Sequence, residues 1–433
     1  MSDIYIPDAG YINGIAQESR IIELSEDQEK ALDFVDKFIN SDKKFAVIGG
    51  CAGSGKSSII PFILKKYSSD VGIISDPFDD YFNTREVEVC AYTGKAVMVL
   101  KRKGIVNAST LHSFLYFHKS VLNKETGEYN IVYEPRDNAY FHHTQLLIVD
   151  EASMVSKELF DLISSKSFKV LYIGDHFQLP PVNDNFNIML NPDFKMEKVL
   201  RQNEDNPIIY LAELARTGQK IPLGVYGNSK HTLKFNKEEL INYDEIITWT
   251  NKSKDMINDF VREQKGFIKD VPQLDDKMIV KANCHSKNLF NGQIVYIMNH
   301  PKMNKNGAWK VEIIDELAYN DPFIMAQTDN YIQANASIHL SKEELNHLKM
   351  LPFEKKWIKK YSRRDTYFVP VSPYQVHLDW GYAITAHSAQ GSSWSNIAVI
   401  LDKRLYHIED CNRWIYTAIT RAEDSVTIYS GNF

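Results

Sequence analysis

The sequence predicts an α/β protein built on two parallel sheets, and three observations support this fold class. Short apolar, β-rich runs alternate with amphipathic stretches, which is typical of strands joined by helical crossovers. A glycine-rich loop lies between the first predicted strand and the helix predicted after it. The chain has 433 residues, of which 44% are hydrophobic and 24% are charged, so it can bury several cores. A peptide, a disordered chain and a coiled coil are thereby excluded.

The first sheet is predicted from four apolar runs, at residues 45–48, 87–91, 146–149 and 170–173. These runs are short and continuous, as in strands that helices cover on both faces. Between the second and the third run, a polar turn containing glycine at 124–128 favours a β-hairpin. We therefore expect a small hairpin insertion in the first domain.

A second α/β unit is predicted from strands at 245–248, 396–401 and 425–429, with a helix-like stretch after the first of them. The strands are far apart in the sequence because a different kind of segment separates them. No internal repeat is visible in the sequence itself.

The separating segment, residues 283–372, is turn-rich and differs from both α/β units. It holds short strand candidates at 293–298 and 309–314, followed by a charged, helix-like stretch. This composition predicts an inserted domain. The resulting organisation is an N-terminal extension at 1–24, a first domain at 25–190 with the hairpin insertion at 113–143, a second domain at 191–282 and 373–433, and the inserted domain at 283–372.

Charge and cysteine usage restrict the function further. Lys and Arg number 50 against 56 Asp and Glu, so contact with nucleic acid would depend on local basic surfaces. The 4 cysteines are far apart and form no C-x-x-C pair, which disfavours a disulfide framework or a zinc site and favours a reducing cytoplasm. No apolar run approaches the roughly 20 residues of a membrane-spanning helix, and no secretion signal opens the chain. We expect a soluble cytoplasmic protein without a membrane partner.

The strongest chemical signal is the run Gly50-Cys51-Ala52-Gly53-Ser54-Gly55-Lys56-Ser57, which fits the phosphate-loop pattern G-x-x-x-x-G-K-[ST]. Glycines let the backbone N–H groups converge on phosphate oxygens, Lys56 supplies a positive charge, and Ser57 supplies a hydroxyl for Mg²⁺. A chance glycine-rich turn is the alternative, but the strand before and the helix after favour the loop. The predicted nucleotide contacts are Gly50, Gly53, Ser54, Gly55, Lys56, Ser57 and Ser58.

A second signal is the apolar run 146–149 that ends in two carboxylates, Asp150 and Glu151. Its position after the phosphate loop is typical of a Walker B strand. Asp150 would hold Mg²⁺, and Glu151 would orient or deprotonate the attacking water. A solvated acidic pair at a strand end is the alternative. Together with the phosphate loop, the pair predicts hydrolysis of a nucleoside triphosphate.

Three further runs, at 174–182, 382–391 and 416–422, complete an ordered series of motifs. They read Gly174-Asp175-His176-Phe177-Gln178-Leu179-Pro180-Pro181-Val182, Tyr382-Ala383-Ile384-Thr385-Ala386-His387-Ser388-Ala389-Gln390-Gly391 and Tyr416-Thr417-Ala418-Ile419-Thr420-Arg421-Ala422. The series resembles the superfamily 1 helicases, in the class B group of Dda-like and RecD-like enzymes. The resemblance spans residues 28–421. It implies two RecA-like domains, with a β-hairpin insertion in the first and an SH3-like insertion in the second.

The resemblance also implies further residues at an ATP site. Gln178 would sense the γ-phosphate, unless its amide only caps a loop. Arg421 resembles the arginine finger of the sixth motif and Arg201 the arginine of the fourth, with a surface salt bridge as the alternative for both. Gly391, after Gln390, would let the backbone approach the nucleotide, unless it only ends a helix.

Gln28 has two interpretations that are compatible with each other. It lies upstream of the phosphate loop, where the family places a glutamine that reads adenine, and an amide can both donate to and accept from that base. The run Ser25-Glu26-Asp27-Gln28 also fits a helix capping box with Gln28 at its third helical position.

The same resemblance implies contacts with single-stranded DNA. Thr93, which follows a predicted strand and opens a helix, and Thr110 with His112 would contact phosphates from the first domain. Thr385 and His387 would do so from the second. Hydroxyls and amides at helix N-termini grip phosphates without reading sequence, as a translocating motor requires. An ordinary helix N-cap is the alternative for each.

Both insertions suggest contacts with nucleic acid. The hairpin resembles the pin that splits duplex DNA, and Tyr133 falls where the family places an aromatic residue against the fork; otherwise Tyr133 covers a small core of its own. The stretch 353–364 is rich in basic and aromatic residues. It would track single-stranded DNA or form a solvated amphipathic helix, and we favour the helix.

These observations predict an ATP- and Mg²⁺-dependent DNA helicase that moves 5′→3′, since the Leu179-Pro180-Pro181 variant is typical of 5′→3′ members of the family. The expected partners are single-stranded and fork DNA, with a single-strand binding protein or a recombinase as further candidates. We expect a functional monomer in phage DNA replication or recombination. The alternatives are an ATP-driven clamp, translocase or recombination mediator that does not unwind processively, and an ATPase directed by RNA.

Overall fold

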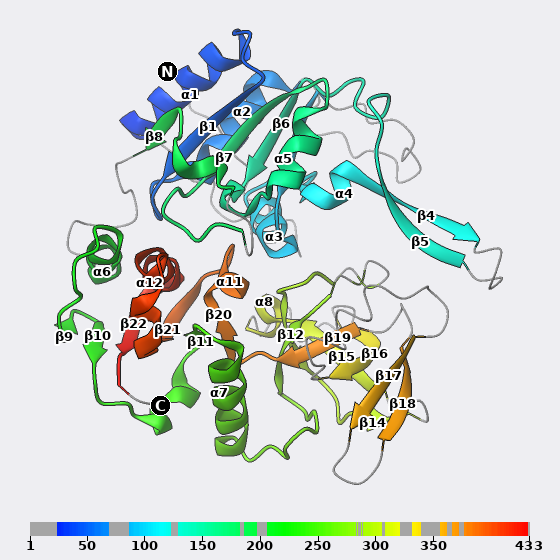
Figure 1. Cartoon of the computed structure of the whole chain (residues 1–433), viewed down its shortest axis with the longest axis vertical. Coiled ribbons are helices and arrows are strands. Elements are labelled where there is room, and N and C mark those ends of the chain that lie inside the picture. Colours follow the sequence, from blue (N-terminus) through cyan, green and yellow to red (C-terminus); the bar gives the residue numbers. More distant parts are fainter. Residues whose placement is uncertain are drawn as a thin grey trace, which may run out of the picture. The chain divides into compact units, whose positions relative to one another are not determined.

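The computed structural model describes residues 24–68, 86–122, 129–181, 186–196, 206–282, 284, 287, 289–304, 308–320, 331–338, 356–361, 366–371 and 376–431. Contacts within the chain define two units. Their helices and strands are labelled in Figure 1. Within the described ranges, no helix is both long and apolar enough to cross a membrane. Unit 1 comprises Met1–Phe117, Pro135–Pro222 and His407–Arg421, and unit 2 comprises His118–Glu134, Leu223–Tyr406 and Ala422–Phe433.

Unit 1 is built on a six-stranded sheet in the order β3-β2-β6-β7-β1-β8, in which every neighbouring pair is parallel. Its central strands are continuous apolar runs, as expected where both faces of a parallel sheet are covered. Because β7 lies between β6 and β1, the carboxyl ends of these three strands meet at one edge. The strands are β1 Phe45–Gly50, β2 Val87–Ala91, β3 Ser109–Thr110, β6 Leu146–Asp150, β7 Lys169–Gly174 and β8 Phe194–Met196.

Helices cover both faces of this sheet. Because side chains alternate along a strand, Ala46 and Ile48 of β1 join the core beneath α1, α2 and α3, whereas Val47 joins the core beneath α4 and α5. α6 and α12 pack against each other. The helices of unit 1 are α1 Glu26–Ile39, η1 Lys56–Ile59, α2 Ile60–Tyr67, α3 Gly94–Arg102, α4 Leu111–Leu115, η2 Ala152–Met154, α5 Lys157–Ser164, η3 Ile188–Leu190, α6 Pro207–Arg216 and α12 Cys411–Ile419.

Unit 2 contains a second six-stranded sheet in the order β20-β11-β21-β22-β10-β9. It is parallel except at its edge, where β9 runs antiparallel to β10. Ile257 and Val261 of α7 pack on Ile246 and Ala398 of the sheet. The elements are β9 Gly224–Tyr226, β10 Ser229–Thr232, η4 Lys237–Asn242, β11 Glu245–Thr248, α7 Asn251–Gln264, β20 Ala383–Thr385, α11 Ala386–Ala389, β21 Trp394–Ile400, η7 Lys403–His407 and β22 Ala422–Tyr429.

A small β-barrel is inserted between β11 and β20 of unit 2. Its strands follow the order β13-β12-β19-β16-β15-β14, and β13 also pairs with β15, which closes the barrel. The predicted α/β class with a β-rich insertion in its second part is confirmed. The elements are β12 Lys277–Val280, β13 Ile294–Ile297, β14 Lys302–Met303, β15 Trp309–Asp315, α8 Glu316–Tyr319, β16 Ile332–Ile338 and β19 Val376–Trp380.

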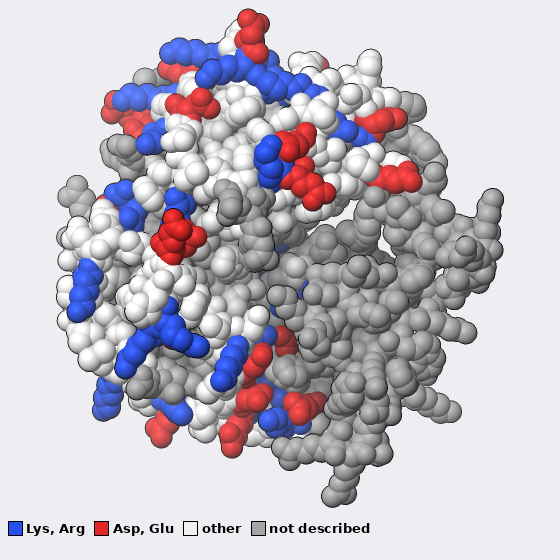
Figure 2. All heavy atoms as spheres, in the orientation of Figure 1, with Lys and Arg blue, Asp and Glu red and all other residues white. Residues whose placement is uncertain are grey.

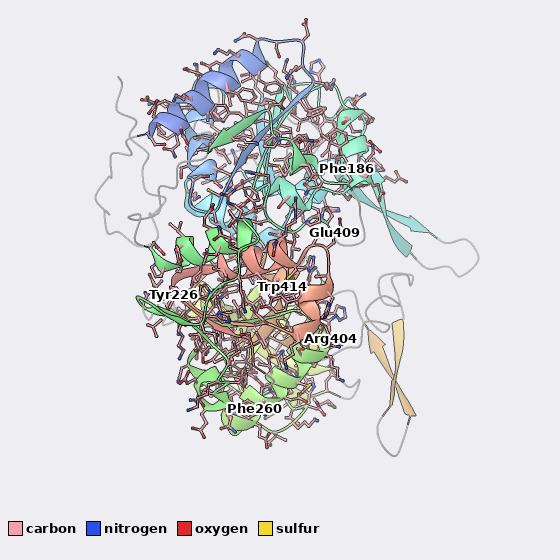
Figure 3. All side chains as sticks on the ribbon, turned by 60° about the vertical axis from the view of Figure 1, so that its left-hand side comes forward. Phe186, Tyr226, Phe260, Arg404, Glu409 and Trp414 are labelled. Carbon is pink, nitrogen blue, oxygen red and sulfur yellow. The ribbon has the colours of Figure 1, made fainter. Side chains whose placement is uncertain are left out.

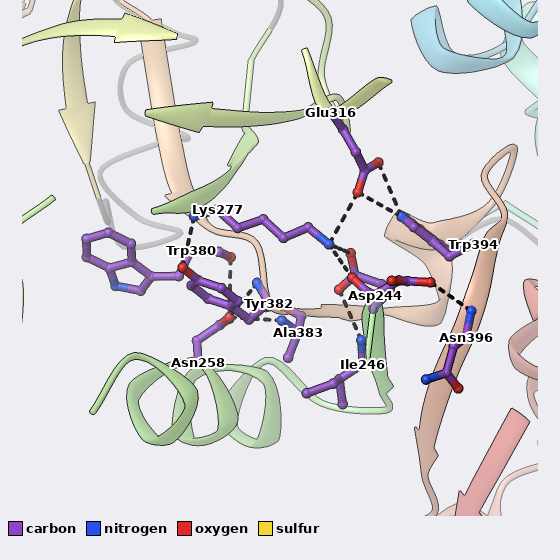
Figure 4. A network of polar contacts seen from close by, with 11 residues as sticks. Asp244, Ile246, Asn258, Lys277, Glu316, Trp380, Tyr382, Ala383, Trp394 and Asn396 are labelled. Carbon is purple, nitrogen blue, oxygen red and sulfur yellow. Dashed lines mark hydrogen bonds and ion pairs between the residues drawn. The ribbon is translucent and has the colours of Figure 1, made fainter. Parts of the chain in front are cut away.

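A buried polar network joins the barrel to the parallel sheet of unit 2 (Figure 4). Lys277 of β12 forms ion pairs with Glu245 of β11 at 3.0 Å and with Glu316 of α8 at 3.3 Å. Trp394 of β21 donates its indole N–H to both oxygens of Glu316, at 3.1 and 3.2 Å. Since buried charges need partners, this network ties the two parts of the unit to one another.

Two small two-stranded sheets complete the described elements. β4 Tyr116–Leu122 and β5 Tyr129–Pro135 pair within the predicted hairpin insertion. β17 Lys356–Tyr361 pairs antiparallel with β18 Thr366–Val371. The amphipathic helix that we favoured over 353–364 is therefore wrong at 356–361. Trp, Ile and Tyr in this run favour a strand, and β18 supplies the backbone partner that a sequence window does not reveal.

Candidate functional site

The phosphate loop follows β1 at the carboxyl edge of the unit 1 sheet. Gly53 and Gly55 have φ values of 81° and 78°, a left-handed region that glycine adopts without strain. Lys56 reaches across the loop and donates from Nζ to the Cys51 carbonyl oxygen at 2.7 Å. The loop therefore has the turn and the positive charge that the sequence pattern predicts.

Asp150 ends β6 at the same edge, and Glu151 follows it. Asp150 accepts the Glu151 backbone N–H through Oδ1 at 3.0 Å. Glu151 itself adopts φ 53° and ψ 42°, a left-handed conformation that is uncommon for a residue other than glycine. Such backbone conformations concentrate at functional sites, where the surrounding structure holds a side chain in a required direction.

The Glu151 carboxyl group interacts electrostatically with residues from several parts of unit 1. Its pKa is raised from the ordinary value, first by burial and then by the neighbouring Asp150 carboxylate, and Asp175 adds to the rise. Arg421 and Lys56 oppose that rise with their positive charges. A carboxylate whose pKa is raised is a stronger base toward water than an ordinary carboxylate.

The residues of the loop fit a bound nucleotide with Mg²⁺. A Cβ atom at Gly50 would lie 2.5 Å from Ser54 Oγ and 3.1 Å from Lys56 Cγ, so the loop closes tightly only around glycine. Ser54 Oγ is buried and has no hydrogen-bond partner among the described residues. The Ser57 hydroxyl and the Asp150 carboxylate are the hard oxygen ligands that Mg²⁺ prefers.

Gln28 performs the capping role that the sequence allowed. Its Oε1 accepts the Ser25 backbone N–H at 2.9 Å, and Ser25 Oγ accepts the Gln28 backbone N–H at 3.3 Å, so the predicted capping box is confirmed. Its Nε2 also donates to the Gly55 carbonyl of the phosphate loop at 3.2 Å. The buried amide thus links α1 to the loop, and adenine recognition stays a prediction.

The segment after β7 is held by α12. Arg413 donates from one guanidinium nitrogen to the carbonyl oxygens of His176 and Gln178, at 3.2 and 3.3 Å. Thr417 Oγ1 accepts the Leu179 backbone N–H at 3.1 Å. The Gln178 side chain is buried, and its Oε1 has no hydrogen-bond partner in the described part of the chain. The capping contact that was the alternative for this oxygen is thus not seen among the described residues.

Arg421 lies just beyond the carboxyl end of α12. It is buried, and it donates from Nε to the Thr417 carbonyl at 3.1 Å and from a terminal nitrogen to Thr420 Oγ1 at 3.2 Å. Trp414 of the same helix, labelled in Figure 3, is buried as well. Arg421 is close enough to Glu151 for its charge to lower the Glu151 pKa.

The predicted DNA-contact threonines of unit 1 are helix N-caps. Thr93 Oγ1 accepts the Ala96 backbone N–H at 3.1 Å at the start of α3. Thr110 Oγ1 accepts the Ser113 backbone N–H at 3.2 Å at the start of α4. His112 is exposed in the first turn of α4. The capping alternative is thus present at both threonines, and the contacts with DNA stay predictions.

The predicted residues of unit 2 lie around the short helix α11. Thr385 precedes α11 without capping it, and its hydroxyl lies 3.1 Å from that of Ser388. His387 is half-buried in the helix, and Gln390 is buried at its end. Gly391 follows with a φ of 73°, as expected of a glycine that ends a helix. Its approach to nucleotide stays a prediction.

Some predicted residues lie outside the described part of the chain. They are Arg201, the Tyr133 side chain, whose backbone forms part of β5, and the side chains of the basic stretch 353–364. On the face drawn in Figure 2, acidic and basic side chains are interspersed over the described surface. This mixed surface agrees with the formal net charge of -6.

Sequence reasoning missed one residue that the structure places in the site. The Tyr416 hydroxyl lies 2.8 Å from both the Ala52 backbone nitrogen of the phosphate loop and Asp175 Oδ2. Tyr416 was part of a recognised motif but received no role. An apolar helix pattern explains a buried tyrosine equally well, so no signal in the sequence singled out its hydroxyl.

Two family models match the chain. The model described as AAA domain matches residues 23–233, and the UvrD-like helicase C-terminal domain matches residues 381–429. The first match contains the phosphate loop and both strand-end carboxylates. The second contains α11, Gly391 and Arg421.

Curated relatives and solved structures point the same way. The chain is 27% identical to the ATP-dependent DNA helicase dda of Enterobacteria phage T4, over 56% of this chain and 57% of that protein. It is 25% identical to the ATP-dependent RecD2 DNA helicase of Deinococcus radiodurans, over 93% of this chain and 48% of that protein. It therefore spans about half the length of these relatives. Bacteroides Pif1 bound to single-stranded DNA shares the fold, with a TM-score of 0.55 and 17% identity over 95% of this chain and 93% of the other.

Proposed function

We propose that this chain moves 5′→3′ along single-stranded DNA. It belongs to class B of the superfamily 1 helicases and resembles their Dda-like and RecD-like members. It has the two RecA-like domains of that class and is an ATP-hydrolysing DNA helicase. Its direction of movement, its use of Mg²⁺ and a role in phage DNA replication or recombination are the parts we propose. The Leu179-Pro180-Pro181 run supports the direction.

The observation that carries the ATPase mechanism is that the phosphate loop and the Asp150–Glu151 pair lie at the same edge of the unit 1 sheet. Lys56 would bind the phosphates, and Ser57 and Asp150 would hold Mg²⁺, which supplies charge neutralisation when bound. Glu151, which directly follows Asp150 at the end of β6, would orient and deprotonate the attacking water. Arg421 would stabilise the charge that develops on the transferring phosphoryl group. We propose Gln178 as the γ-phosphate sensor and retain Arg201 as a second arginine of the site.

Gln28, Gln390 and Gly391 would contact the nucleotide. The predicted contacts with DNA are Thr93, Thr110, His112, Tyr133, Thr385 and His387. A capping hydroxyl uses one acceptor lone pair, so its O–H can still donate to a phosphate oxygen. Thr93 and Thr110 therefore can cap and bind at once. We propose single-stranded and fork DNA as substrates, activity as a monomer, and a single-strand binding protein or recombinase as a partner. The cytoplasmic location stays a prediction from cysteine usage.

ATP hydrolysis in the presence of single-stranded DNA tests the site directly. Lys56→Ala should reduce turnover to background, because charge neutralisation and positioning supply most of phosphoryl-transfer catalysis. Arg421→Lys should lower kcat by about a thousandfold and leave nucleotide binding nearly unchanged, since an ammonium cannot reproduce the planar fork of a guanidinium. A malachite-green phosphate assay and binding of a fluorescent ATP analogue measure the two quantities.

Matched surface variants control for the change of residue type. Lys30→Ala removes an exposed lysine of α1, and Arg404→Lys alters an exposed arginine of unit 2. Both should retain wild-type hydrolysis. Wild-type ATPase in Lys56→Ala would overturn the site assignment. Stimulation by single-stranded RNA but not DNA would replace the DNA substrate with RNA.

A further inference from the structure

The Tyr416 side chain connects three segments of unit 1 through one oxygen atom. Its hydroxyl accepts the Ala52 backbone N–H of the phosphate loop at 2.8 Å and donates to Asp175 Oδ2, also at 2.8 Å. Asp175 is fully buried, and its other oxygen accepts the Phe177 backbone N–H at 3.0 Å. The phosphate loop, the end of β7 and α12 therefore meet at this hydroxyl.

The hydroxyl is in its neutral, donating form near pH 7, where an ordinary tyrosine is also protonated. Burial raises the pKa of Tyr416 well above its ordinary value, and the negative charge of Asp175 raises it further. The ring is fixed as well, because Phe177 packs against it edge-on with 5.9 Å between the ring centroids. The guanidinium of Arg216 lies 4.6 Å from the centroid of the Phe177 ring. The packing of the Tyr416 ring thus sets the position from which its hydroxyl forms hydrogen bonds.

The Tyr416 hydroxyl contacts a different segment from the one that other side chains of α12 contact. Outside their own helix, Arg413 and Thr417 bind the segment after β7, at His176, Gln178 and Leu179. Tyr416 adds the phosphate loop itself. Arg421 follows on the same helix end, and its charge acts on Glu151. A change at the Tyr416 hydroxyl would therefore alter how the loop and the arginine are held together.

We propose that Tyr416 is a positioning residue for ATP hydrolysis. Its hydroxyl fixes the position of α12 relative to Ala52 of the phosphate loop and Asp175 at the end of β7. Arg421, just beyond α12, is thereby placed against the transferring phosphoryl group. This inference rests on the proposed role of Arg421. It concerns the chemical step and not the affinity for nucleotide, since Tyr416 itself touches neither the Lys56 ammonium nor Ser57 in the described contacts.

Steady-state ATPase kinetics of Tyr416→Phe test the proposal. The ring stays and the hydroxyl leaves, so Ala52 and Asp175 lose their shared partner. We expect kcat to fall by about tenfold to a hundredfold, the scale of small misplacements at a reacting centre, and KM for ATP to change by less than about twofold. An affinity measurement with a fluorescent ATP analogue should give the wild-type value.

The chain offers a matched control in Tyr382. Its hydroxyl also accepts a backbone N–H, from Lys277 at 3.0 Å, and also donates to a buried carboxylate, Asp276, at 3.1 Å. Tyr382→Phe removes the same pair of bonds within unit 2. We expect the two variants to lose similar stability in thermal unfolding, while only Tyr416→Phe shows the large fall in kcat.

A second variant keeps the proposal testable if Tyr416→Phe folds poorly. Thr417→Val preserves the side-chain shape and removes the acceptor for Leu179, so it loosens the same helix without touching the phosphate loop. Its kcat should fall by less than that of Tyr416→Phe, at unchanged KM. An unchanged kcat in Thr417→Val would overturn the idea that α12 positions the site.

The remaining outcomes separate this inference from the proposed function. If Lys56→Ala and Arg421→Lys lose hydrolysis but Tyr416→Phe keeps wild-type kcat, the site assignment stands and the positioning role fails. Tighter nucleotide binding in Tyr416→Phe would also contradict it, because the hydroxyl would then compete with nucleotide for the loop. If Lys56→Ala retains activity, the proposed function itself fails.

Discussion

At the scale of single residues, several predicted functional side chains also have a structural partner. Gln28 completes a capping box and binds the phosphate loop, and Thr93 and Thr110 cap helices. The two tasks are compatible because each side chain has more donor and acceptor positions than the cap uses. A cap in the structure thus decides neither for nor against a contact with ligand.

The buried network of unit 2 predicts a pH dependence of stability. Burial raises the pKa of Glu245 to about 7 from 4.5, against the opposing charge of Lys277. Between these values the folded state binds a proton that the unfolded state has released, so stability should fall as pH rises from about 4.5 to about 7. The loss attributable to Glu245 should be of the order of 3 kcal/mol. Urea unfolding of unit 2 between pH 4.5 and 7.5 measures it.

Glu245→Gln isolates this contribution because glutamine cannot ionise. The variant should lack the part of the pH dependence that Glu245 supplies. Glu238→Gln, at an exposed position of η4, serves as control and should follow the wild type. A Glu245→Gln profile parallel to the wild-type profile would show that Glu245 does not titrate in this range.

Residues of the site differ in how far the sequence could identify them. Lys56 and Asp150 follow from local patterns, a glycine-rich loop after a strand and an acidic residue at a strand end. The role of Tyr416 depends on contacts with Ala52 and Asp175, which are distant in the sequence. No periodicity or spacing encodes such a contact, so only the folded structure reveals it.

At the scale of elements, strands buried on both faces were the most predictable. Runs such as 146–149 contain consecutive apolar residues because helices cover both faces of the sheet. The stretch 356–361 was mistaken for a helix because its basic residues suggested a solvated face. Pairing with β18 decides its conformation, and pairing between strands is a tertiary property.

The hairpin of β4 and β5 carries the prediction for strand separation. Tyr133→Ala should abolish duplex unwinding and keep ATPase that single-stranded DNA stimulates, because a ring stacked on the fork is worth about 1–3 kcal/mol per base. Val132→Ala, at the neighbouring position of β5, is the matched control for truncating a side chain of this strand. Equal loss of unwinding and of ATPase in Tyr133→Ala would indicate a role in folding of the hairpin.

At the scale of the whole molecule, the order of motifs along the chain predicted the fold class well. The two largely parallel sheets follow from where the apolar runs lie, whereas the β-rich fold of the inserted domain was implied by the family resemblance. The contacts of residues 407–421 with unit 1 could not be read from the sequence, which places them between strands of the second sheet. For these residues, the neighbours along the chain differ from the neighbours in space, and packing alone determines the neighbours in space.

The charge distribution also belongs to this scale. The formal net charge is -6, and the described surface in Figure 2 mixes both signs. We therefore expect long-range attraction to DNA to contribute little and the predicted local phosphate contacts to supply the grip. Such contacts do not read bases, which suits movement along any sequence.

The most direct test of a 5′→3′ DNA helicase compares strand separation on two matched duplexes, one with a 5′ and one with a 3′ single-stranded tail. ATP should open the 5′-tailed duplex only, and Lys56→Ala should open neither. Opening of only the 3′-tailed duplex would contradict the direction. If ATPase responds to DNA and neither duplex opens, the chain is a clamp or translocase, and the helicase assignment is contradicted.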